Sequence, residues 1–156
     1  MRGVASVDRL PRIQYAALPW RFTNGALEIL LVTTRNARRW IVPKGWPMPH
    51  CAPPECAAHE AYEEAGVVGE VAAKSLGAFT YEKQLKSGKT VTCNVEVFPL
   101  AVARQRRAWP EKRARQADWC SVEEALSRIA EPGLRRIVAK LTKDVKALRK
   151  HPRSVA

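Results

Sequence analysis

A helix-forming segment between residues 53 and 66 constrains this chain more than any other feature, because it gathers three negative charges. Glu60, Glu63 and Glu64 have the i, i+3, i+4 spacing that places side chains on one face of a helix. Like charges at this spacing cost roughly 0.2–0.5 kcal/mol per pair, so we expect a positive partner beside them. Mg²⁺ or Mn²⁺ would suit the carboxylate oxygens; a solvated acidic face is the alternative.

Both ends of this helix are marked in the sequence. Pro53 and Pro54 suit a first turn, where the missing N–H is not needed, and Glu55 complements the helix dipole. Gly66 provides a C-terminal stop, so the pattern predicts a helix over about 53–65. Small residues define a second face that we expect to pack on a sheet, away from the glutamates: Ala57, Ala58, Ala61 and Ala65.

Composition places this helix in a basic globular protein. The chain has 156 residues, of which 46% are hydrophobic, and no apolar run long enough to span a membrane. Its formal net charge of +12 predicts anionic partners, phosphates in particular. Residues 1–11 are expected to be a flexible segment without a signal peptide's apolar stretch, which favours the cytoplasm; an organellar-targeting segment is the alternative.

Short apolar runs on both sides of the helix predict a mixed or antiparallel sheet. Asn24-Gly25 separates the first two runs and is a strong hairpin signal, since both residues accept positive φ. The prolines and glycine of residues 43–49 predict a loop without regular structure. The expected strands are 13–22, 27–33, 39–42, 67–71, 77–83 and 90–102.

Two further helices are expected near the C-terminus. Ser121 and Glu124 form a capping box that opens a helix through about residue 130. Apolar residues at helical spacing predict an amphipathic helix over about 133–150. Its other face is basic, so RNA is one candidate partner and a solvated basic face is the alternative; the residues are Arg135, Arg136, Lys140, Lys143, Lys146, Arg149 and Lys150.

The stretch from Gly45 to Val67 resembles the Nudix signature G-x5-E-x7-R-E-U-x-E-E-x-G-U, in which U is aliphatic, in register over its full length. Two positions depart from it: the first glutamate is Cys51 and the arginine is His59. Short sequence segments outside the signature resemble those of the diphosphoinositol polyphosphate and diadenosine polyphosphate hydrolases of that superfamily. The resemblance covers most of residues 12–142, within a single expected domain over 12–150.

This resemblance implies an α/β fold, an α/β/α sandwich with a mixed, partly antiparallel sheet and a loop–helix–loop catalytic motif. It implies Mg²⁺- or Mn²⁺-dependent cleavage of a diphosphate linkage. Glu60, Glu63 and Glu64 match the family's catalytic metal ligands, and the carbonyl of Gly45 is a further implied ligand. The proton acceptor would be a carboxylate of this cluster or one from a later segment, such as Glu96 or Glu111.

The two departures are expected to fall on residues that support the glutamates. We expect His59 to hold Glu63 or a loop carbonyl by a hydrogen bond, and Cys51 to be a thiol. Zinc binding by the local histidines and cysteines is an alternative, although their spacing is not that of a standard finger. Without a CxxC pair, the cysteines are expected to be thiols: Cys51, Cys56, Cys93 and Cys120.

Basic residues on both sides of the helix could bind a highly phosphorylated substrate: Arg35, Arg39, Lys44 and Lys83. Such a substrate would be a nucleoside polyphosphate, a dinucleoside polyphosphate or a diphosphoinositol polyphosphate. One alternative is a non-catalytic nucleotide- or RNA-binding module, and another is an RNA 5′-pyrophosphohydrolase. A monomer or a homodimer is expected, without membrane attachment.

Overall fold

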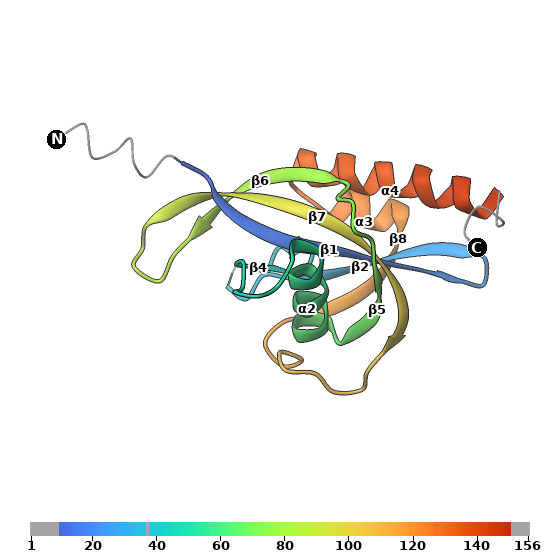
Figure 1. The fold of residues 1–156 in the computed structure, drawn as a ribbon, viewed down its shortest axis with the longest axis horizontal. Helices are drawn as coiled ribbons and strands as arrows, with labels where there is room; N and C mark the ends of the chain where they lie inside the picture. Colours follow the sequence, from blue (N-terminus) through green and yellow to red (C-terminus); the bar gives the residue numbers. More distant parts are fainter. Residues whose placement is uncertain (1–9, 37, 151–156) are drawn as a thin grey trace.

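The computed structural model describes residues 10–36 and 38–150, and the strands of these residues join in one mixed sheet (Figure 1). Strand β1 (Arg12–Thr23) and strand β2 (Ala26–Thr33) form the expected hairpin. Asn24 and Gly25 turn the chain with φ of 51° and 83°. Most of the segment expected to precede the domain, residues 1–9, lies outside the described residues.

The long strand β7 (Thr90–Gln105) lies beside β1 and runs parallel to it from Arg12 to Trp20. Strands β5 (Val67–Val71) and β6 (Gly77–Gln84) both pair with β7 in the antiparallel direction. A parallel pair needs a long crossover connection. Here that connection contains the glutamate-bearing helix, which is thereby brought back across the sheet.

Two short strands differ from expectation. Lys44–Gly45 forms strand β4, antiparallel to β1, so the prediction of an irregular loop over 43–49 was wrong for these residues. Pro43 does not prevent the pairing, because its carbonyl still accepts the N–H of Ala17 at 3.0 Å. Strand β8 (Ala117–Ser121), which pairs with β2, was not predicted because it is short and polar residues interrupt its apolar pattern.

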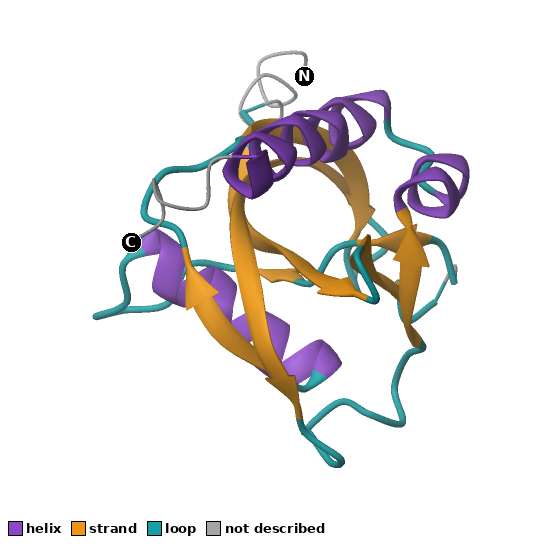
Figure 2. Cartoon of the chain, turned by 90° about the vertical axis from the view of Figure 1, so that its right-hand side faces the viewer, coloured by secondary structure: helices purple, strands orange, loops and turns teal. Residues whose placement is uncertain are grey.

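Three helices complete the described fold. Helix α2 (Pro53–Ala65) covers one face of the sheet, whereas α4 (Pro132–Lys150), with α3 (Val122–Arg128) beside it, covers the other (Figures 1 and 2). This arrangement confirms the α/β/α sandwich. Strand β3 (Trp40–Ile41), shorter than expected, pairs with β2.

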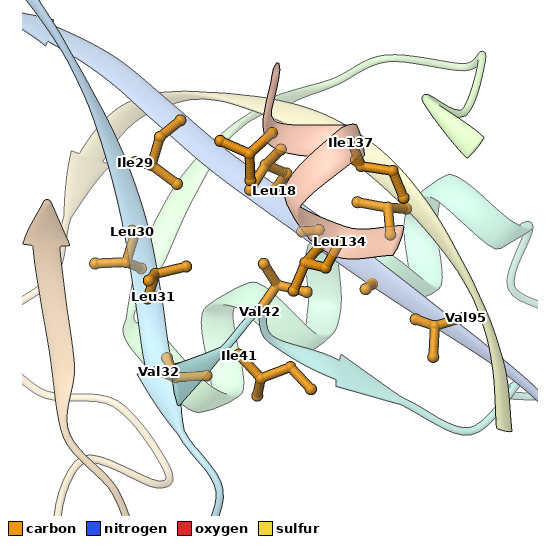
Figure 3. Close-up of a cluster of buried hydrophobic side chains, with 14 of the residues drawn as sticks. Leu18, Ile29, Leu30, Leu31, Val32, Ile41, Val42, Val95, Leu134 and Ile137 are labelled. Atoms are coloured by element: carbon orange, nitrogen blue, oxygen red, sulfur yellow. The ribbon is translucent and has the colours of Figure 1, made fainter. Parts of the chain in front are cut away.

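Capping and amphipathic burial explain the two C-terminal helices. The Ser121 hydroxyl accepts the N–H of Glu124 at 3.1 Å, and the Glu124 carboxylate accepts the N–H of Ser121 at 3.2 Å. Leu134 and Ile137 of α4 enter the core near Leu18 of β1 (Figure 3). The basic residues described on α4 are exposed on its other face: Arg135, Arg136, Lys140, Lys143 and Lys146.

The alanine face of α2 packs against the sheet as expected, with one correction. Ala57, Ala61 and Ala65 are fully buried, but Ala58 is only half-buried. Glu64 lies among the buried residues of α2, although we expected all the glutamates on a different face. A residue one position before Ala65 can be covered when another segment packs on that side of the helix, and the 106–116 segment does so here.

Candidate active site

Glu60 and Gly45 face each other where α2 meets β4. A Cβ atom added at Gly45 would lie 2.3 Å from both the carboxylate carbon and Oε2 of Glu60. Strand β4 is held in place because Gly45 pairs with Tyr15 of β1. Glycine therefore lets the Glu60 carboxylate approach the backbone at residue 45 without displacing either element.

Glu64 is the most enclosed glutamate of α2. Its side chain is only 6% exposed, and Oε1 lies 3.5 Å from Nη1 of Arg115, whose side chain is 9% exposed. Burial raises the pKa of Glu64 to about 8, although the positive charges of Arg115 and Lys44 oppose that shift. Repulsion by Glu60 and Glu111 adds to the rise, so additional positive charge would stabilise the ionised carboxylate.

Glu111 is a fourth carboxylate beside the three of α2. It belongs to the connection between β7 and β8, residues 106–116, which we call the 106–116 loop. The pKa of Glu60 is raised first by burial, and also by the negative charges of Glu63 and Glu111. The acidic group predicted on one helix is therefore completed by a residue from a distant segment.

The 106–116 loop is anchored to the C-terminal end of α2. The N–H groups of Arg106 and Glu111 donate to the carbonyls of Gly66 and Glu63 at 2.8 and 2.9 Å. Gly66 has φ of 71°, and a Cβ atom there would lie 2.2 Å from the ring of Trp109. Carbonyls that a helix end normally leaves unpaired are thus satisfied by this loop.

Arg115 is the site residue that sequence reasoning missed. Its Nη2 lies 2.7 Å from Oε1 of Glu111, and its Nη1 also donates to the carbonyl of Thr33 at 3.2 Å. The i, i+4 spacing of Glu111 and Arg115 was the available sequence signal. That spacing is common, and nothing in it indicates that Glu64 lies on the other side of the guanidinium.

Cys51 and His59, which replace the signature's glutamate and arginine, make separate contacts. His59 Nε2 lies 3.2 Å from Oε2 of Glu63. The Sγ of Cys56 donates to the Cys51 carbonyl at 3.4 Å, and the hydrogen bond between their side chains, with burial, raises the Cys51 pKa to about 11. All four cysteines are free thiols. The zinc alternative stays a prediction.

Of the four basic residues predicted to bind substrate, Lys44 lies near Glu64 and Lys83 lies near Lys44. Lys44 is half-buried, with Nζ 4.8 Å from the centre of the Tyr81 ring. Burial lowers the pKa of Lys44 to about 8 despite the nearby charge of Glu64, and the charge of Lys83 lowers it further. Lys44 therefore places one amine beside the acidic cluster, and Lys83 is a second amine near Lys44.

The other two predicted residues are placed differently. Arg39 Nη1 lies 3.5 Å from Oε2 of Glu131, which immediately precedes α4. Arg39 is therefore held on the α4 side of the sheet, opposite α2. Arg35 is exposed in the turn that follows β2.

The oxygen donors at this site fit Mg²⁺ or Mn²⁺ by type. Such ions prefer carboxylates and carbonyls, and the Glu60 carboxylate lies against the backbone of Gly45. Two other carboxylates have partners at present, Glu63 with His59 and Glu64 with Arg115. Within residues 10–36 and 38–150, no three of the His, Cys, Asp and Glu side chains are arranged to hold a metal ion.

Comparison with known proteins assigns the family. The NUDIX domain model matches residues 13–141. Because this match covers most of the chain, the protein belongs to the Nudix family, whose hydrolases generally need divalent metal ions.

Two curated relatives illustrate the range of similar proteins. The chain is 33% identical to Nudix hydrolase 21, chloroplastic, of Arabidopsis thaliana over 114 residues, which cover 70% of this chain and 55% of the relative. It is 34% identical over 102 residues to diphosphoinositol polyphosphate phosphohydrolase 3-alpha of Mus musculus, covering 64% and 58%. The chain thus spans little more than half the length of these relatives.

Solved structures support the fold. The crystal structure of C. elegans Ap4A hydrolase aligns with a TM-score of 0.64 at 18% identity, covering 87% of this chain and 99% of that one. Within residues 10–36 and 38–150, no helix is long and apolar enough to cross a membrane.

Proposed function

We propose that residues 12–150 form one catalytic Nudix domain, a metal-dependent pyrophosphohydrolase that cleaves a diphosphate linkage. The contact between Glu60 and Gly45 carries this proposal, because it joins a helix carboxylate to the backbone at the first glycine of the signature. Glu63, Glu64 and Glu111 surround that contact. An exposed acidic helix face would not require a glycine opposite one of its carboxylates.

Each residue of the site has a chemical task in this proposal. Glu60, Glu63, Glu64 and the Gly45 carbonyl would hold Mg²⁺ or Mn²⁺. When bound, such an ion neutralises charge on diphosphate oxygens and makes water more acidic. Lys44, beside Glu64, and Lys83, near Lys44, would bind further phosphate oxygens.

Glu111 is our candidate for the proton acceptor. It lies close enough to Glu60 and Glu64 to raise the pKa of both, yet it comes from a different segment and keeps partial exposure. A general base must lie within hydrogen-bond reach of the water it deprotonates. Placement at the edge of the cluster suits that role better than placement among the metal ligands.

A polyphosphorylated small molecule is the proposed substrate class. The net charge of +12, Lys44 beside Glu64 and Lys83 near Lys44 favour a ligand with several phosphates over an uncharged conjugate. Two similar proteins carry such compounds in their names, a diphosphoinositol polyphosphate and Ap4A. The basic face of α4 lies across the sheet from α2 (Figure 1), which gives an RNA path to the glutamates no support.

The cellular setting stays a prediction. We expect a cytoplasmic protein that is a monomer or a homodimer. The Arabidopsis relative named above is called chloroplastic, and that compartment is a property of that protein.

A panel of substrates tests the proposed function. Nucleoside triphosphates, dinucleoside polyphosphates, diphosphoinositol polyphosphates and 5′-triphosphorylated RNA would each be incubated with the protein and Mg²⁺ or Mn²⁺. We expect phosphate, mononucleotide or the shortened inositol phosphate to be released from at least one small molecule. Tight binding without turnover with either metal would instead identify a non-catalytic binding module.

Metal affinity should rise with pH up to about 8. Glu64 has its pKa raised to about 8 by burial, so below that pH a proton competes with the cation for its oxygens. Among the charges around Glu64, those of Arg115 and Lys44 lower its pKa, whereas those of Glu60 and Glu111 raise it. One displaced proton corresponds to about tenfold in affinity per pH unit.

Titration calorimetry with Mg²⁺ at pH 6, 7 and 8 measures this dependence. Glu64→Gln removes the competing proton, so its weaker affinity should change much less over the same range. Equal pH dependence in both proteins would place the titrating group elsewhere.

A further inference from the structure

Arg115 lies between two carboxylates of the site. One guanidinium nitrogen lies 3.5 Å from Glu64 and the other 2.7 Å from Glu111. Its backbone is fixed as well, since the N–H of Gln116 donates to the Thr33 hydroxyl at 3.0 Å. A buried cation held between two carboxylates supplies the positive charge that their crowding requires.

We propose that Arg115 is an internal counter-ion that competes with the divalent metal for Glu64 and acts as a positioning residue. In the metal-free protein it neutralises Glu64 and Glu111 and holds both in place. When a cation binds at the glutamates, Arg115 releases Glu64. The inference rests on the proposed function, because it assumes that Glu64 is a metal ligand.

The geometry favours an Arg115 that competes with the metal for Glu64 over an Arg115 that only holds Glu64 in place. The carboxylate oxygen that faces Arg115 cannot direct the same lone pairs to a metal, and neighbouring positive charges repel each other strongly when they are buried. Glu64 has a second basic neighbour in Lys44, so it remains partly compensated when the guanidinium leaves. Glu63 has a separate partner, His59. Among the glutamates of α2, Arg115 therefore competes with the metal for Glu64.

A cavity lies beside Arg115. Arg115 lines a cavity of about 390 Å³ at the edge of the 106–116 loop. The other residues that line this cavity are Trp109, Lys112, Gln116, Ala117 and Asp118. Movement into that cavity would not disturb the hydrogen bonds that attach the loop to α2, because those involve the backbone of Arg106 and Glu111.

Arg115→Met tests the competition by removing the charge while keeping a long apolar stem. Mn²⁺ affinity would be measured by electron paramagnetic resonance at pH 8.5 under argon, where protons compete least. We expect binding at least about tenfold tighter than in the wild type, because a neighbouring charge alters cation binding to a carboxylate by this order. A divalent ion is also repelled by the guanidinium about twice as strongly as a proton.

The thermal unfolding midpoint without metal is measured alongside the Mn²⁺ affinity. The unfolding midpoint of Arg115→Met should fall by roughly 5–10 °C without metal, since a buried charge pair is broken, and Mn²⁺ should restore most of the loss. Arg113→Met, an exposed arginine of the same loop, should leave both quantities unchanged. Weaker or equal Mn²⁺ binding in Arg115→Met would overturn the proposal.

The wild-type protein offers a test that does not depend on a variant's folding. The Nε–Hε NMR signal of Arg115, assigned by its loss in Arg115→Lys, should shift as Mg²⁺ saturates the site, whereas that of Arg113 should not. Saturation without a shift at Arg115 would overturn the counter-ion role but leave the proposed hydrolase intact. Absence of any Mg²⁺ or Mn²⁺ binding would overturn both.

Discussion

Glu64→Gln is expected to lower kcat by about 10³-fold or more on the best substrate of the panel. A metal ion contributes several kcal/mol of charge stabilisation to the transition state, and each 1.36 kcal/mol corresponds to tenfold in rate. The amide keeps the size of the glutamate but cannot supply the negative charge that retains the ion. Glu64→Gln also removes one of the two carboxylate partners of Arg115, so the metal-free unfolding midpoint is expected to fall, by less than in Arg115→Met because Glu111 remains beside the guanidinium.

Steady-state kinetics together with thermal unfolding separates these effects. Glu123→Gln is the matched control, since Glu123 is exposed on α3 across the sheet from α2. The control should keep wild-type kcat. If Glu64→Gln turned over substrate at the wild-type rate while folded, Glu64 would not be a ligand of the catalytic metal.

Gly45→Ala is expected to lower kcat by about 10²-fold while changing stability by no more than about 1 kcal/mol. Its methyl group would lie 2.3 Å from the Glu60 carboxylate, which must move away. A carboxylate at the end of a flexible side chain can swing aside at low cost to the fold. The displaced ligand is the costly part, since small misplacements at a reacting centre reduce rates by this order.

Activity and urea unfolding should be compared for this variant and for Gly88→Ala. Gly88 has φ of 91° and open space around its Cβ position, so its substitution strains the backbone without touching the site. The two variants should therefore show opposite patterns, with activity lost in one and stability lost in the other. Full activity in Gly45→Ala would contradict the proposed ligand role of Glu60.

Several elements could be predicted because each depends on local residues. The β1–β2 hairpin follows from Asn24-Gly25, and α2 from its prolines and Gly66. The capping box at Ser121 places the start of α3. Helix α4 follows from its apolar periodicity, and the family resemblance came from the spacing of the signature residues.

The missed features depend on contacts between distant segments. Burial of Glu64 requires the 106–116 loop to pack on α2, and no periodicity within 53–65 encodes that loop. Strand β8 forms because its backbone completes the free edge of β2, a role that its own polar residues do not indicate. Arg115 lies at the site because β8, which begins two residues later, fixes the end of the loop.

Because the 106–116 loop is attached to α2, the positions of its charged residues at the active site depend on the number of residues in the loop. Insertions in most surface loops are tolerated because little depends on their path. Here one added residue between Arg106 and Arg115 would shift Glu111 or Arg115 along α2 and change the charge that Glu64 experiences. Variation in this connection is therefore a route by which metal affinity could be tuned while every signature residue stays the same.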